Sequence, residues 1–379
     1  MRFHIKLRSL LGVLLAAVIA GGFIFYIASR PDESRGTVVI WYVEDDPLSA
    51  GLKKLAVEYN NSHARSSLPV KLRCFSDEDA LAGAFETGAP DILLCSHYRA
   101  FDMDRRGKLT DISGDLGKSG PEYPKTVSSR GSSIGKSFFP VGLDMQALLI
   151  NRSLCTSGSF DTMDALCAAA GAYRAETGKA FFAVDSYSSL FFTELLREDE
   201  EFTAAVPINS ADESAVTLYN LLAECAYDGS ITVSADSAAS AVYSGALPCA
   251  IVPVSALPPA RTDGFGIYSV PPLRTGSGSG DLGEAFGLAV IAGSSRSTGD
   301  IAAFIEWLFS GSRDEKLALQ CPLVPAQPGS LIIGNALRDA IAGLESGGIV
   351  ALPEEDSVFL SNRDGFETYF RSRMAFLSE

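Results

Sequence analysis

Short apolar runs alternate with segments of helical spacing in the first part of the chain. Three runs are typical of buried strands: residues 37–43, 70–75 and 91–95. Between the first two, apolar residues recur at the spacing of one helix face: Leu52, Leu55, Ala56 and Tyr59. Residues 77–87 predict a second helix. This β-α-β-α-β order predicts a parallel sheet with helices on both faces, an α/β fold whose ligands bind at the carboxyl ends of the strands.

A second α/β region follows from residue 151. Helices are predicted over residues 161–177, 189–198, 210–225 and 298–310, and strands over 180–184, 249–254 and 286–291. The Gly/Ser-rich stretch 275–283 follows Pro271 and Pro272, so it predicts a surface loop and not a phosphate-binding loop. Residues 331–377 are predicted to be mostly helical.

The first thirty residues have the pattern of a membrane-directed segment. Arg2, Lys6 and Arg8 precede an uncharged stretch over residues 9–29. Roughly 20 apolar residues suffice to cross a bilayer as a helix, and the basic flank stays in the cytoplasm. Residues 1–30 are therefore a signal-anchor or a signal peptide, and the rest is extracytoplasmic. The stretch exceeds a typical signal-peptide core of about 7–15 residues, which favours a retained anchor.

Composition excludes several classes of function. The net charge is −15 and no basic stripe is present, so we expect no nucleic-acid partner. The seven cysteines include no CxxC pair and no nearby His, so we expect mostly free thiols, no metal and no cofactor. The predicted extracytoplasmic part holds two histidines, His63 and His97, with no GxSxG or HExxH motif, so we expect no enzyme.

Four stretches in order along the chain resemble a known family. They are VVIWYVEDDPLSAGLKKLAVEYN (38–60), AFETGAPDILLCSHYRAFDMDRRGKLTDIS (84–113), FFPVGLDMQALLINRSL (138–154) and FGLAVIAGSSRSTGDIAAFIEWLFSGSRDEKLALQCPLVPA (286–326). Together they are similar to family 1 extracellular solute-binding proteins, the group that includes maltose-binding protein.

The resemblance implies a two-lobed periplasmic-binding-protein fold of type II, with parallel-type sheets flanked by helices. After a linker (31–36), we expect the first lobe over 37–143 and 283–325. The second lobe is expected over 144–282, with a helical part over 326–379. A monomer would capture a small polar solute between the lobes and deliver it to the permease of an ABC importer.

The resemblance also implies which residues contact the ligand. Glu44, Asp45 and Asp46 match the first binding loop, and Ser96, His97, Tyr98 and Arg99 match the loop after the third strand. Asp144 falls at the hinge, Asp185 and Tyr187 match a loop of the second lobe, and Ser255 lies where an aromatic platform commonly sits. Each has a structural alternative: a solvated or helix-capping carboxylate, a hinge hydrogen bond, or a packed Tyr.

The chain departs from the pattern of the family's sugar-binding members. It has two tryptophans, Trp41 and Trp307, and both are predicted to pack in the core. A carbohydrate remains the first expectation for the ligand. A cationic solute such as a polyamine is an alternative, because the expected cleft is acidic and has few aromatic platforms. A membrane-anchored sensor or scaffold with a degenerate cleft is another.

Overall fold

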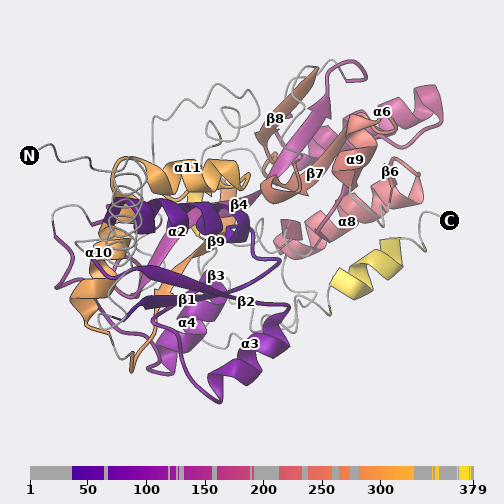
Figure 1. The fold of residues 1–379 in the computed structure, drawn as a ribbon. Coiled ribbons are helices and arrows are strands. Elements are labelled where there is room, and N and C mark those ends of the chain that lie inside the picture. Colours follow the sequence, from indigo (N-terminus) through magenta and orange to yellow (C-terminus); the bar gives the residue numbers. More distant parts are fainter. Residues whose placement is uncertain are drawn as a thin grey trace, which may run out of the picture.

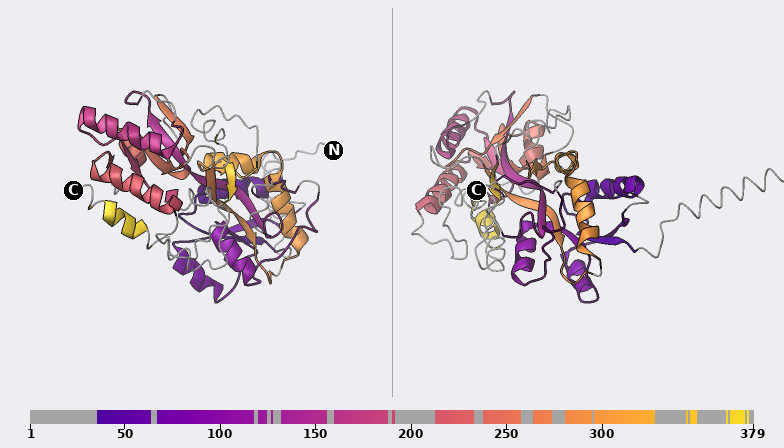
Figure 2. Two further views of the ribbon diagram at one scale, coloured as in Figure 1. Left: turned by 180° about the vertical axis from the view of Figure 1, so that it is seen from behind. Right: turned by 90° about the vertical axis from the view of Figure 1, so that its left-hand side faces the viewer.

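The computed structural model places the helices and strands in two lobes joined by a long strand (Figure 1). Figure 2 shows the same two lobes from two further directions. The structure describes residues 36–63, 67–117, 120–124, 127, 132–155, 160–187, 190–191, 213–232, 238–257, 264–273, 281–294, 296–327, 344, 346–349, 365, 367–374 and 376. The predicted membrane segment and the predicted helix over 189–198 lie outside these residues, apart from residues 190–191.

The first lobe is built on three parallel strands, as predicted. They are β1 (Val38–Val43), β2 (Val70–Phe75) and β3 (Ile92–Ser96), with β1 between the other two. A fourth strand, β9 (Asp281–Val290), runs antiparallel to β3. The sheet is therefore mixed, and the prediction of parallel-type sheets is correct in part: β1, β2 and β3 run parallel, whereas β9 runs antiparallel to β3.

Alternating side chains of β1 supply both faces of this sheet. Val38, Ile40 and Tyr42 belong to the core beneath one set of helices: α2 (Ser49–His63), α10 (Thr298–Phe309) and α11 (Arg313–Gln320). Trp41 points the other way, into the core beneath α3 (Glu78–Phe85) and α4 (His97–Arg105). This two-residue period explains why Trp41 is buried, and Trp307 on α10 is also buried, so the prediction that both tryptophans pack in the core is confirmed.

The long strand β4 (Phe138–Asn151) passes from one lobe to the other. Its first half pairs antiparallel with β9, and its second half pairs antiparallel with β7 (Cys249–Pro253) and β8 (Phe265–Ser269). The change occurs between Met145, opposite Gly283, and Gln146, opposite Pro253. One continuous strand therefore connects the two sheets. The short β10 (Val324–Pro325) pairs with β4 on the side of the first lobe.

The second lobe repeats the layered arrangement on a smaller scale. Strand β5 (Phe182–Val184) lies parallel to both β7 and β6 (Ile231–Thr232). Helices α6 (Met163–Thr177), α8 (Glu213–Tyr227) and α9 (Ala238–Tyr243) complete the lobe, and the one-turn helix η1 (Val254–Ala256) follows β7. Thr162 caps α6 through its hydroxyl, and Gly178 ends it in a left-handed conformation.

The C-terminal part contains a strand that the sequence analysis does not predict. Strand β11 (Ser346–Ile349) pairs parallel with the start of β9, so the prediction of mostly helix over 331–377 is wrong there. Farther on, Phe370 and Met374 are buried in the core of the second lobe. The predicted surface loop is also too long, because β9 already begins at Asp281. Among the described residues, no helix is long and apolar enough to cross a membrane.

Candidate functional site

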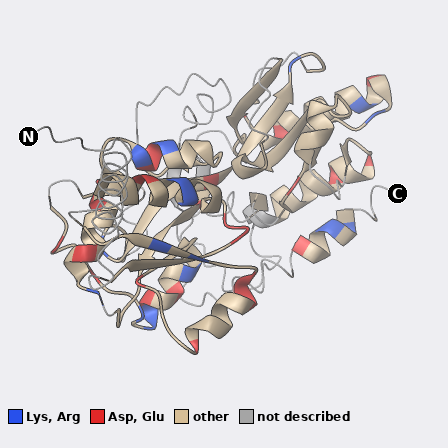
Figure 3. Ribbon diagram, in the orientation of Figure 1, with Lys and Arg blue, Asp and Glu red and all other residues tan. Residues whose placement is uncertain are grey.

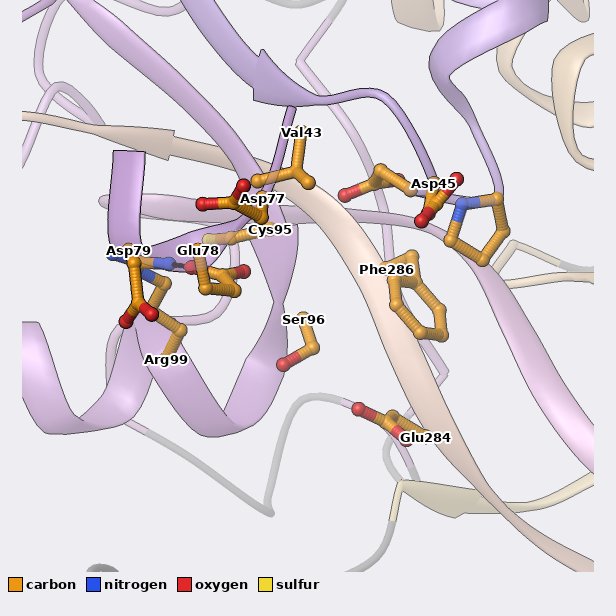
Figure 4. A pocket seen from close by; sticks show the side chains of 12 residues that line it. Val43, Asp45, Asp77, Glu78, Asp79, Cys95, Ser96, Arg99, Glu284 and Phe286 are labelled. Atoms are coloured by element: carbon orange, nitrogen blue, oxygen red, sulfur yellow. Dashed lines mark ion pairs between the residues drawn. The ribbon is translucent and has the colours of Figure 1, made fainter. Parts of the chain in front are cut away.

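A pocket of about 630 Å³ lies at the carboxyl ends of β1, β2 and β3. The parallel order brings these three strand ends to one edge of the sheet, the position at which α/β sheets bind ligands. Strand β9, next to β3, forms another wall. The lining residues are Val43, Asp45, Asp46, Pro47, Asp77, Glu78, Asp79, Cys95, Ser96, Arg99, Glu284 and Phe286 (Figure 4).

The turn after β1 holds two of the predicted ligand-contacting carboxylates against the pocket. Asp46 accepts a hydrogen bond from the Leu48 N–H at 3.1 Å, and its own N–H donates to the Val43 carbonyl at 3.2 Å. These bonds fix the turn before α2. Burial raises the pKa of Asp46 to about 7, although the Leu48 N–H opposes this. Asp45 also lines the pocket, whereas the exposed Glu44 does not.

An ion pair joins the two helices on the opposite side of the pocket. Arg99, in the first turn of α4, contacts the carboxylate of Glu78, the first residue of α3 (Figure 4). Burial lowers the pKa of Arg99, which the nearby Asp102 opposes. Asp77 caps α3 by accepting a hydrogen bond from the Ala80 N–H at 2.8 Å. The ion pair with Glu78 thus holds the guanidinium of Arg99 at the pocket wall.

The lining is strongly acidic. Six of the twelve lining residues carry a carboxyl group, and Arg99 is the one cation among them. Figure 3 shows acidic residues in the turn after β1 and at the start of α3. Glu78 pairs with Arg99, and carboxyl groups outnumber cations in the lining by six to one. The pocket therefore offers many hydrogen-bond acceptors and a negative potential.

Strand β9 adds the aromatic side chain of the pocket. Phe286 is half-buried, and its ring stands across the pocket from Arg99 (Figure 4). Phe286 lies opposite Ser96 in the β3–β9 register, which places the ring beside the end of β3. Glu284, two residues earlier, points to the same side of the strand and lines the pocket as well.

Four residues that were predicted to contact the ligand lie outside the pocket lining: His97, Tyr98, Asp144 and Ser255. His97 is fully buried, and its Nδ1 accepts a hydrogen bond from the Ala285 N–H at 3.0 Å. Tyr98 is buried beside it. The expectation that His97, Tyr98 and Arg99 lie in a loop is wrong, because α4 begins at His97 immediately after β3. Asp144 and Ser255 bind each other where β4 passes between the lobes.

Asp185 and Tyr187 also lie away from this pocket. An oxygen of Asp185 accepts a hydrogen bond from the Ala238 N–H at 2.6 Å, which caps α9, and its carbonyl accepts one from Arg371. Tyr187 is fully buried against Phe370. These contacts attach the C-terminal segment to the second lobe. The buried Tyr187 matches its structural alternative, a packed Tyr, whereas Asp185 binds the first N–H of α9 from a distant position in the chain and is not the N-cap residue of that helix. Contact of either residue with a ligand remains a prediction.

Eight lining residues were not predicted, and five of them are charged or aromatic: Asp77, Glu78, Asp79, Glu284 and Phe286. Asp77, Glu78 and Asp79 follow β2, whose carboxyl end lies at the same edge of the sheet as the ends of β1 and β3. The predicted strand order could therefore have placed these three residues at the pocket. Glu284 and Phe286 depend on the pairing of β9 with β3, which no local pattern indicates. Within the described part of the chain, no group of three or more His, Cys, Asp or Glu residues has the arrangement of a metal site.

Comparisons with known proteins agree with this architecture. Two solved structures each match 90% of this chain and 95% of their own at 16% identity with a TM-score of 0.66: a cyclic α-maltosyl-1,6-maltose binding protein of Arthrobacter globiformis and a maltose-bound protein of T. maritima. The GacH receptor of Streptomyces glaucescens, solved unliganded and with acarbose, matches 90% of this chain and 96% of its own at 17% identity with a TM-score of 0.63.

Likeness at this level of identity shows the two-lobed α/β fold. No similar sequence was found among curated proteins. The family model described as bacterial extracellular solute-binding protein matches residues 75–310, which span more than half of the chain. The match includes β3, β4, β7, α10 and the strand β9 that lines the pocket. The chain therefore belongs to the bacterial extracellular solute-binding proteins.

Proposed function

We propose that this protein captures a small polar solute, a carbohydrate first of all, in the pocket at the ends of β1, β2 and β3 and delivers it to an ABC importer. The supporting observation is the lining itself, which combines carboxylates, one guanidinium and an aromatic ring in a pocket of about 630 Å³. The structural neighbours described as binding maltose or related saccharides support the choice of ligand.

The lining suits the surface of a sugar. Sugar hydroxyls donate hydrogen bonds to carboxylates such as Asp45 and Glu284, and Arg99 donates to sugar oxygens. The ring of Phe286 covers the apolar C–H face of a pyranose, which is the role of an aromatic platform. Because β4 continues from the first lobe into the second, bending at this strand would close the second lobe over the pocket.

A cationic solute is the second candidate, and the charge of the pocket favours it. Six carboxyl groups surround one guanidinium, which is itself paired with Glu78. A polyamine or an amino-substituted sugar would relieve the repulsion between these carboxylates, whereas a neutral sugar would not. The aromatic ring of Phe286 suits this ligand also, because cations bind to the faces of aromatic rings.

Thermal unfolding of the full-length protein in detergent separates the candidates. Mono- and oligosaccharides, polyamines, amino acids and anions are added singly. A ligand at about 100 times its Kd raises the free energy of unfolding by about 2.7 kcal/mol. For a polyamine we expect the affinity to fall steeply as salt is raised, and for a neutral sugar to change little. Absence of any shift across the panel would contradict solute capture and favour the anchored sensor or scaffold.

Charge-neutral variants test whether the ligand occupies this pocket. Asp45→Asn and Glu284→Gln remove lining carboxylates on two walls, and we expect each to weaken binding at least tenfold. Asp115→Asn removes an exposed carboxylate outside the lining and serves as the matched control. Equal affinities in all three variants would place the ligand elsewhere.

We also propose that residues 9–29 anchor the protein in the membrane as an uncleaved helix, so that the binding lobes work as a monomer beside the permease. The support is the length of the uncharged stretch and its basic flank. N-terminal sequencing of the membrane fraction tests this directly. A mature N-terminus near residue 30 would show cleavage and overturn the anchor.

A further inference from the structure

Two of the seven free cysteines lie in contact between helices of the second lobe. The side chains of Cys167 on α6 and Cys225 on α8 are close enough to interact with each other. The two helices pack directly against one another. Cys225 is buried in the core of this lobe, and Cys167 lies at the edge of the same core, half-buried. The two cysteines thus lie on neighbouring helices of one core, with their side chains close enough to interact.

We propose that Cys167 and Cys225 form a disulfide that ties α6 to α8 in the exported protein. The family places this domain outside the cytoplasm, where disulfides form and persist. The inference does not depend on the proposed ligand, because both cysteines belong to the second lobe and the pocket is lined from the first lobe and β9.

The reaction needs an oxidant with a disulfide of its own, either an extracytoplasmic dithiol–disulfide oxidase or a small-molecule disulfide. The Cys167 thiolate attacks one oxidant sulfur, which forms a mixed disulfide and releases one oxidant thiol. The Cys225 thiolate then displaces the second oxidant thiol and closes the Cys167–Cys225 bond. Two electrons pass from the cysteines to the oxidant, and the two cysteine protons end on its thiols.

The surroundings of the pair indicate when this reaction occurs. The hydrogen bond to Cys225 and burial raise the pKa of the Cys167 thiol, and the carboxylates of Asp164 and Asp228 raise it further. Since only the thiolate attacks a disulfide, oxidation is slow once α6 and α8 have packed. We infer that the bond forms while the exported chain folds, and that the same burial then protects it from reduction.

The remaining cysteines differ from this pair. Cys74 is exposed on β2, in the first lobe. Cys249 lies near Cys155, but its thiol donates to the Phe181 carbonyl at 3.8 Å. The contact across α6 and α8 is therefore the arrangement that best favours a bond, and the test must distinguish it from a Cys155–Cys249 bond.

The test is peptide mapping of the full-length protein purified from the membrane after its free thiols are blocked with N-ethylmaleimide in denaturant. Trypsin alone is insufficient. No Lys or Arg separates Cys155 from Cys167 or Cys225 from Cys249. A second cleavage at aspartate separates both pairs. Asp161 and Asp164 lie between Cys155 and Cys167, and Asp228 and Asp236 lie between Cys225 and Cys249. We expect a linked Cys167–Cys225 peptide that disappears on reduction, and two fewer blocked thiols than the seven of the reduced protein.

A second measurement compares the Tm of the protein before and after reduction. Reduction of the wild type should lower the Tm by roughly 5 °C or more, because a crosslink closing a long loop restricts the unfolded chain. Cys74→Ser should respond to reductant as the wild type does, whereas Cys167→Ser and Cys225→Ser should not respond. Maleimide on both Cys167 and Cys225 in the exported protein, or a bond from either to another cysteine, would overturn the proposal. The wild-type map decides the matter even if a serine variant does not fold.

Discussion

The carboxylate of Asp144 accepts two hydrogen bonds from Ser255, one from its N–H at 3.1 Å and one from its hydroxyl at 2.6 Å. Asp144 lies on β4 two residues before that strand changes partner from β9 to β7, and Ser255 lies in η1 directly after β7. The pair therefore spans the passage between the lobes. Both residues were expected to contact a ligand; in this structure they bind each other at the hinge, and contact with a ligand stays a prediction.

This contact predicts a pH-dependent effect of Asp144→Asn. Burial raises the pKa of Asp144 to about 6 from an ordinary value of 3.8, although the hydrogen bonds from Ser255 oppose this. The contribution of Asp144 to stability is therefore full below about pH 4 and is lost as the pH rises through about 6. As the pH is raised from about 4 to about 7, we expect the free energy of unfolding of the variant to rise by about 2–3 kcal/mol relative to that of the wild type. Urea unfolding at both pH values measures this, and a difference independent of pH would contradict it.

Arg99→Ala should distinguish the two proposed ligand classes. A neutral carbohydrate loses a hydrogen-bond donor, so we expect its Kd to rise about tenfold or more. A cationic ligand loses a repulsive neighbour, and its Kd should fall. Arg105→Ala, on the same helix and outside the lining, is the control. Isothermal titration calorimetry measures both variants, and an equal effect of the two would exclude a role for Arg99 at the site.

Phe286→Ala should weaken binding of either ligand class by about tenfold, because the ring supplies the aromatic face of the pocket. Phe286→Tyr retains the ring and should bind as the wild type does. Circular dichroism checks that both variants are folded, and calorimetry gives the affinities. Unchanged binding by Phe286→Ala would show that the ligand does not use this wall.

Gly287 and Gly83 should respond in opposite ways to substitution by Ala. A Cβ on Gly287 would meet the Phe139 carbonyl oxygen and lie 2.7 Å from the Cα of Pro140, the residue opposite Gly287 in the β4–β9 pair. These are backbone atoms, so we expect a loss of about 3 kcal/mol or more. Gly83 lies inside α3 with nothing within 4 Å of a Cβ, so Gly83→Ala should stabilise by up to about 1 kcal/mol. Urea denaturation measures both; destabilisation of equal size would contradict this account of Gly287.

Local patterns account for much of the first lobe and for part of the pocket. The strand 70–75 was predicted at the bounds the structure has, and the predicted strand ends place Asp45, Asp46, Ser96 and Arg99 along the lining. His97 shows the limit of this reasoning. A residue directly after a buried strand suggests a binding loop, yet α4 starts there and the imidazole accepts a hydrogen bond from Ala285 of β9. That partner lies far along the chain, so no local pattern indicates it.

Local sequence patterns predict the alternation of strands and helices and the edge of the sheet at which polar residues gather, and four stretches of the chain carry the resemblance to solute-binding proteins. The patterns do so because burial imposes a two-residue period on strands and a 3.6-residue period on helices. Only the tertiary structure decided that β9 lies between β3 and β4, which brings Glu284 and Phe286 to the pocket. It also decided that Asp144 and Ser255 meet at the hinge. Those contacts join segments that are distant in the chain, and their pairing depends on the packing of both lobes, which no local period encodes.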